Sequence, residues 1–77
     1  MKAYVLIHTE LGAIPEVLEA VKKIKEVKEA YSVYGVYDIV AKVEAESMVK
    51  LKEAVTWKIR RLNQVRSTLT MIVMEDP

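Results

Sequence analysis

The sequence lacks the residues on which several classes of site depend: it has no cysteine and a single histidine in 77 residues. Without cysteine there are no disulfides, thiolate metal sites or cysteine nucleophiles, and one histidine cannot form a metal-binding cluster. The apolar runs are far shorter than the ~20 residues that a membrane span needs, and no signal peptide precedes the first predicted strand. We therefore expect a cytoplasmic protein without metal or cofactor.

The sequence also lacks an excess of charge of either sign. Lysine and arginine total 12 and aspartate and glutamate total 11, which gives a net charge of +1 with both signs interspersed. Such a chain has no strong field directed toward nucleic acid or a membrane surface, so we expect neither as a direct partner. The length predicts one domain over residues 1–77. A domain below roughly 80 residues usually needs disulfides, a metal or oligomerisation, and only oligomerisation remains.

The hydrophobic pattern predicts the order strand, helix, strand, strand, helix, strand. The predicted strands are 2–9, 28–35, 37–45 and 65–74, and a short polar tail follows at 75–77. Pro15 suits the first turn of a helix, and Ser47 suits the N-cap of the second. The apolar stripes of the two helices are Ile14, Leu18, Val21, Ile24 and Val27, and then Met48, Leu51, Val55, Ile59 and Leu62.

This order is typical of an α+β, ferredoxin-like βαββαβ sandwich. Its four-stranded antiparallel sheet carries both helices on one face, and right-handed crossovers place the first and third strands at the centre. The opposite face should be polar in a monomer, yet the first predicted strand is apolar on both faces, with Ala3, Val5 and Ile7 on one and Tyr4 and Leu6 on the other. The last predicted strand repeats this pattern, with Leu69, Met71 and Val73 against Ile72 and Met74. A second copy of the chain is the simplest cover for such a face.

Trp57 lies opposite the apolar stripe of the second predicted helix, so it should point outward. One interpretation is an exposed aromatic ring packed on lysine stems. The other is a second contact between subunits, because tryptophan often anchors interfaces.

Two short segments carry the polar chemistry. Gly35 and Val36 predict the two-residue loop of a type II′ hairpin, directly followed by Tyr37 and Asp38. Ser67-Thr68-Leu69-Thr70 is predicted as an alternating strand that lines up its hydroxyl groups on one face. A carboxylate suits an ammonium group, while hydroxyls and backbone N–H groups suit a carboxylate, so together they would hold both ends of an amino acid. Asp is also common after turns, and Thr is common in strands. The sequence shows no nucleophile–base pair or carboxylate dyad for catalysis.

The Gly-x-Tyr-Asp segment at 35–38 and the Val-x-Ser-Thr-x-Thr segment at 65–70, on this order of elements, resemble the effector domain of the leucine-responsive/AsnC (Lrp/AsnC) transcription regulators. This domain is called RAM, and the similarity covers essentially the whole chain. The family usually has Pro-Gly where this chain has Asn63-Gln64, so the turn into the last strand is expected to differ. Because the sequence starts directly with the first predicted strand, we expect no helix-turn-helix segment, and the chain resembles the stand-alone, demi-type feast/famine regulatory proteins.

The resemblance implies dimers that pair through their sheets and assemble into rings, with an amino-acid effector between dimers. It also implies that Asp38 takes the ammonium and that Thr68 and Thr70 take the carboxylate. Full-length regulators of the family are implied partners. The expected amino-acid site comprises Gly35, Val36, Tyr37, Asp38, Ser67, Thr68 and Thr70. Two alternatives remain: a small dimeric ferredoxin-like enzyme of the monooxygenase type, and a purely structural assembly domain.

Overall fold

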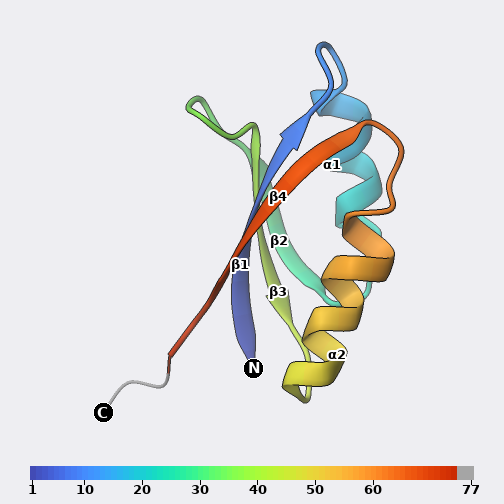
Figure 1. Cartoon of the computed structure of the whole chain (residues 1–77). Coiled ribbons are helices and arrows are strands. Elements are labelled where there is room, and N and C mark those ends of the chain that lie inside the picture. The colour runs from blue at the N-terminus through green and yellow to red at the C-terminus, as the bar shows by residue number, and fades with distance from the viewer. Residues whose placement is uncertain (75–77) are drawn as a thin grey trace.

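A computed structural model describes residues 1–74, so the predicted polar tail at 75–77 lies outside the described part of the chain. The elements follow the predicted order (Figure 1). They are β1 (Lys2–Thr9), α1 (Ile14–Lys22), β2 (Val27–Ser32), β3 (Ile39–Glu44), α2 (Met48–Glu53), the π-helical continuation η1 (Ala54–Ile59) and β4 (Val65–Ile72).

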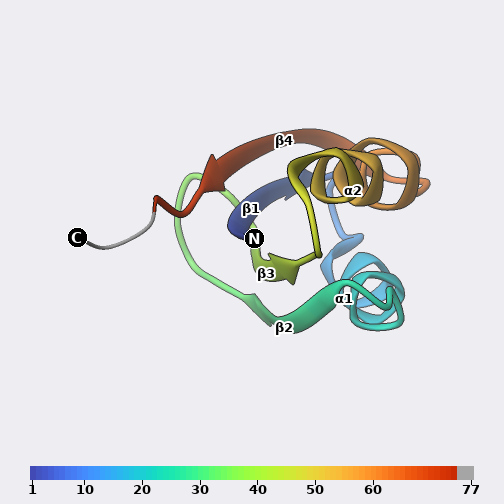
Figure 2. The ribbon, with the colours of Figure 1, turned by 90° about the horizontal axis from the view of Figure 1, so that it is seen from below.

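The four strands form one antiparallel sheet in the order β2-β3-β1-β4. The first and third strands are therefore central, and both helical segments cover the same face of the sheet (Figure 2). This confirms the ferredoxin-like α+β fold. The core lies between the two layers because alternate residues of β1 and β3 face the helices. Its fully buried strand residues are Ala3, Val5, Ile7, Ile39, Ala41 and Val43.

The first helix is shorter than its apolar pattern suggests. It ends at Lys22, and Val27, predicted as part of the helical stripe, is instead the first residue of β2. The chain leaves the helix through tight i→i+3 hydrogen bonds, from Ile24 N–H to the Val21 carbonyl (3.1 Å) and from Val27 N–H to the Ile24 carbonyl (3.1 Å). Val27 is buried in the strand as it would have been in the helix, which explains why periodicity alone placed it in the wrong element.

The second helix follows the prediction closely. Ser47 is its N-cap, and the Ser47 hydroxyl accepts a hydrogen bond from Lys50 N–H at 3.2 Å. Leu51, Val55 and Ile59 of the predicted stripe are buried. The last part widens into the π-helix η1, where Arg60 N–H donates to the Val55 carbonyl at 2.8 Å, five residues back.

The predicted two-residue hairpin is wrong. β2 ends at Ser32 and β3 begins at Ile39, so the connection spans 33–38 and is closed by a hydrogen bond from Val33 N–H to the Asp38 carbonyl (2.8 Å). A type II′ turn needs a positive φ at its first central residue, and Gly35 does not have one. The resulting loop extends away from the body of the sheet (Figure 1). The last strand is also shorter than predicted, since it ends at Ile72 rather than Met74.

The face of the sheet away from the helices, which we call the open face, is apolar at its centre. Tyr4, Leu69, Met71 and Val73 are each about two-fifths exposed on β1 and on or directly after β4. Leu6 is paired with Leu69, and Tyr4 with Met71, so these side chains form one continuous patch. Toward β2 the face becomes charged, because Lys42 lies 3.7 Å from Glu29 and 3.6 Å from Glu44. The two-sided apolar sheet predicted from the sequence is confirmed.

Candidate functional site

Asp38 anchors the 33–38 loop to the end of β1. Its N–H donates to the Ile7 carbonyl at 2.9 Å, and its Oδ2 accepts from Thr9 N–H at 2.9 Å and from the Thr9 hydroxyl at 3.4 Å. A quarter of the Asp38 side chain remains exposed, and His8 Nε2 lies 3.9 Å from the same oxygen. One carboxylate oxygen is thus used within the subunit. The other makes no hydrogen bond to residues 1–74, so it is available to a donor from outside.

The rest of the loop is open to solvent. Gly35 and Val36 are exposed at its tip, and 85% of the Val36 surface is accessible. Tyr37 turns back toward β1, where its ring meets the His8 ring edge to face at 6.2 Å and 73°. The loop therefore has an exposed apolar tip at Val36 and a carboxylate, Asp38, that is fixed where the loop joins β3. This arrangement is suitable for contact with another molecule.

The hydroxyl groups of β4 do not all share one face. Thr68 is paired with Ile7 and Thr70 with Val5, both of which face the helices, so the two threonines point the same way. Ser67 is paired with His8 and points to the open face. The predicted alignment thus holds for Thr68 and Thr70 and does not include Ser67.

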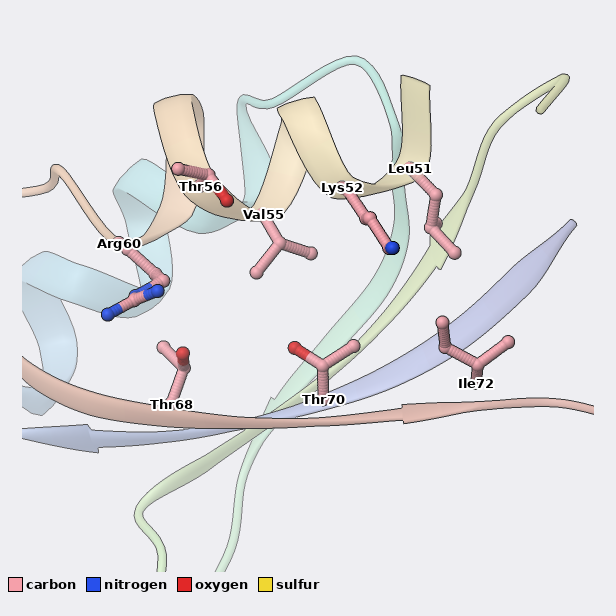
Figure 3. A pocket seen from close by; sticks show the side chains of 8 residues that line it. All are labelled: Leu51, Lys52, Val55, Thr56, Arg60, Thr68, Thr70 and Ile72. Atoms are coloured by element: carbon pink, nitrogen blue, oxygen red, sulfur yellow. The ribbon is translucent and has the colours of Figure 1, made fainter. Parts of the chain in front are cut away.

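Thr68 and Thr70 line a groove between β4 and the helical segment α2–η1, with a cavity volume of about 380 Å³ (Figure 3). From the helix, Lys52, Thr56 and Arg60 line the same groove. Its lining is completed by the apolar side chains Leu51, Val55 and Ile72. From the sequence, Arg60 is expected at a solvated helix end, and neither Lys52 nor Thr56 stands out. Their i, i+4, i+8 spacing is the available signal, since residues at that spacing share a helix face.

Asp38 lies in a different and smaller hollow, of about 160 Å³, at the end of β1. Its other lining residues include Thr9, Gly12 and Arg66, and Arg66 Nε lies 3.8 Å from Glu10 Oε2. Within one subunit, therefore, the structure does not bring Asp38 together with Thr68 and Thr70. The two sets of side chains line separate hollows of the subunit.

A further ion pair fixes η1 to the segment before β2. Lys58 Nζ donates to both oxygens of the Glu26 carboxylate, at 2.9 and 3.0 Å. This hydrogen bond lowers the pKa of Glu26 below its ordinary value, and the charge of Lys58 acts in the same direction. The pair therefore links η1 to the segment between α1 and β2.

Residues 1–74 contain no group of three His, Cys, Asp or Glu side chains arranged to hold a metal ion. Over the same residues, no helix has the length and apolar character to cross a membrane.

Comparison with known proteins places this arrangement in a family. The family model described as the Lrp/AsnC ligand binding domain matches residues 2–77. A search of curated proteins found no match. Among solved structures, the chain is similar to FFRP-DM1, with 41% identity, a TM-score of 0.91, and coverage of 95% of this chain and 97% of that one.

It is also similar to TTHA0845 from Thermus thermophilus, with 33% identity, a TM-score of 0.93, and coverage of 99% of this chain and 95% of that one. Escherichia coli AsnC is 30% identical with a TM-score of 0.91, over 99% of this chain and 52% of AsnC. The family match spans nearly the whole sequence, and these structures agree with it in fold. The chain therefore belongs to the Lrp/AsnC ligand-binding-domain family.

Proposed function

We propose that this protein is a non-enzymatic module that binds an amino acid between its own subunits and acts within a system of Lrp/AsnC-type regulators. The observation that carries the proposal is the division of polar groups between two hollows. The Asp38 carboxylate keeps one oxygen free at the end of β1, while Thr68 and Thr70 present their hydroxyls in the groove beside η1. An ammonium and a carboxylate are the groups that these two sets would recognise.

Assembly is the second part of the proposal. The apolar open face around Leu6 and Leu69 suits pairing of two sheets, because a contiguous exposed apolar patch marks an interaction surface. Further contacts between dimers would bring the 33–38 loop of one subunit toward the threonines of another. The Lrp/AsnC family membership supports both the effector and the regulatory role. Full-length regulators of the family are the partners we propose.

Calorimetric titration of the protein with each of the twenty amino acids tests whether the protein binds an amino acid and identifies which one. Asp38→Asn is the informative variant, since its amide oxygen still accepts the Thr9 N–H hydrogen bond and only the charge is lost. Loss of a desolvated charge partner costs about 2–5 kcal/mol, or roughly thirtyfold to several thousandfold in affinity. Thr70→Val should cost less, about 1–3 kcal/mol, because a neutral donor is lost.

Glu10→Gln is the matched control, because Glu10 lines the same hollow as Asp38 and its carboxylate pairs with Arg66 at the surface. An amino acid that binds Asp38→Asn as tightly as the original protein would contradict the assigned site. An assembled protein that binds none of the twenty would contradict the sensing role and leave a purely structural domain.

A further inference from the structure

The groove between β4 and α2–η1 has an unusual balance of charge for a site that receives a zwitterion. Its lining contains two cationic side chains, Lys52 and Arg60, and no acidic residue. Within residues 1–74 neither cation makes an ion pair. Two cationic side chains with no acidic residue beside them in the lining make the groove electropositive, which favours an anion.

The hydrogen-bonding groups in the groove also favour an anion. Hydroxyls of Thr68 and Thr70 extend from β4 toward the helix, and Lys52 and Arg60 extend from the helix toward the strand (Figure 3). Thr56 adds a hydroxyl to the lining on the helix side. Arginine offers a planar fork that matches a carboxylate, and lysine offers a point charge with three donors. Hydroxyl groups donate to an anion without adding charge. The groove therefore has donors on both walls.

The backbone gives an independent reason to regard this groove as a site. η1 is a π-helix, and π-helical turns are rare and often found at functional sites. Its i→i+5 hydrogen bond joins Val55 and Arg60, both of which line the groove. The turn is therefore widened at the point where the helix contributes its guanidinium.

The groove is also partly apolar. Leu51, Val55 and Ile72 supply the remaining lining, and Leu51 and Val55 are almost completely buried in the core behind it. A volume of about 380 Å³ lies within the range of small-molecule sites, which combine apolar walls with a few directed polar groups. An inorganic anion would leave these walls in contact with water.

We propose that this groove binds a small organic carboxylate that has no ammonium group, such as a 2-oxo acid with a short branched side chain. Arg60 and Lys52 hold the carboxylate, Thr68 and Thr70 donate to its oxygens, and the apolar residues contact the side chain. The proposal goes beyond amino-acid binding because it does not require Asp38. It makes the deaminated form of an amino acid a second ligand of the same threonines.

The test is titration of the assembled protein with 4-methyl-2-oxopentanoate at low ionic strength. Binding is measured by calorimetry and by the changes in NMR chemical shift of Thr68 and Thr70. Arg60→Gln and Lys52→Gln should each weaken binding about ten- to a hundredfold, as expected for loss of a charge-assisted hydrogen bond. Arg61→Gln and Lys50→Gln are matched controls, since Arg61 stacks on Trp57 and Lys50 lines a different hollow. Both controls should bind within about twofold of the original protein.

Two further arms separate this proposal from the amino-acid site. Asp38→Asn should leave binding of the 2-oxo acid unchanged while it weakens binding of whichever of the twenty amino acids the protein takes. Inorganic phosphate should bind more weakly than the 2-oxo acid, because it gains nothing from the apolar walls. Equal losses in Arg60→Gln and Arg61→Gln, loss of the 2-oxo acid in Asp38→Asn, or tighter binding of phosphate would each overturn the proposal.

Discussion

At the scale of single residues, Gln64 departs from ordinary backbone geometry. It is the only non-glycine residue in the described part of the chain with a positive φ, at 73°. Its carbonyl accepts a hydrogen bond from Glu10 N–H at 2.8 Å, which fixes the turn into β4 against the end of β1. A left-handed conformation costs a residue with a Cβ about 1–2 kcal/mol, so the turn holds Gln64 in a strained state.

Gln64→Gly should therefore stabilise the protein. The strain that glycine relieves is larger in free energy than the extra conformational entropy it gives the unfolded chain. The free energy of unfolding should therefore rise by about 0.5–1 kcal/mol. Urea unfolding measures this difference. Asn63→Gly is the control, because Asn63 does not have a positive φ and glycine there should only destabilise. A lower unfolding midpoint for Gln64→Gly would show that the side chain of Gln64 supports the turn.

At the scale of elements, the Glu26–Lys58 pair links η1 to the segment before β2. Lys58→Met should raise the pKa of Glu26 toward its ordinary value of 4.5 and lower stability by about 0.2–1 kcal/mol at neutral pH, because the pair is partly exposed. NMR titration of the Glu26 carboxyl group measures the pKa. Lys50→Met serves as the control, since Lys50 is not paired with Glu26.

The sign of the pH dependence follows from the lowered pKa of Glu26. The stabilising contribution of Glu26 is complete above the pKa that its carboxyl group has in the unfolded chain. It disappears as the pH falls through the lower pKa of the same group in the folded state. The stability of the original protein and of Lys58→Met should thus converge in acid. A stability difference that stays constant far into the acid range would assign the effect to packing of the lysine stem instead.

Trp57 gives the second prediction at this scale. It points outward as the sequence predicted, with 61% of its surface exposed, and Arg61 lies over its ring at 5.1 Å. If Trp57 is the second subunit contact, Trp57→Ala should leave dimers and remove larger assemblies, as measured by light scattering. Arg61→Ala, which removes the cation and keeps the ring, should have the smaller effect. Unchanged large assemblies in Trp57→Ala would leave the ring as an exposed aromatic packed on Arg61.

The sequence predicted long periodic segments well and short polar connections poorly. The stripe through Leu51, Val55 and Ile59 was sufficient to place the second helix, because each position faces one core. The 33–38 loop was mistaken for a tight hairpin because Asp38 bonds to Thr9, 29 residues away. Local turn chemistry carries no sign of such a contact. For the same reason the groove was missed: its two walls, the helix and β4, meet only once the sheet has formed.

At the scale of the whole molecule, the proposed pairing of two sheets places the open face at the subunit contact. Leu69→Glu should place an unpaired charge in the centre of a sheet-to-sheet contact, where it costs at least about 3 kcal/mol, or more than a hundredfold in dissociation constant. Light scattering at micromolar concentration should show at least dimers for the original protein and mainly the 8.8 kDa chain for the variant.

The subunit itself should remain folded in Leu69→Glu, because 45% of the Leu69 surface is already exposed. Val49→Glu is the matched control: Val49 is 65% exposed on α2, away from the open face. Circular dichroism should be the same for both variants. If Leu69→Glu and Val49→Glu assemble equally well, the sheets do not form the subunit contact.

The central position of β1 has a consequence for how the chain reaches this structure during its synthesis. Among the described strands β1 comes first in the chain, and it pairs with both β3 and β4, which comes last among them. Until β4 leaves the ribosome, one edge of β1 and the apolar side chains beside it have no partner. Because contacts distant in sequence form late and leave strand edges exposed until then, the sheet of this domain is complete only once β4 has been made and is free to pair with β1.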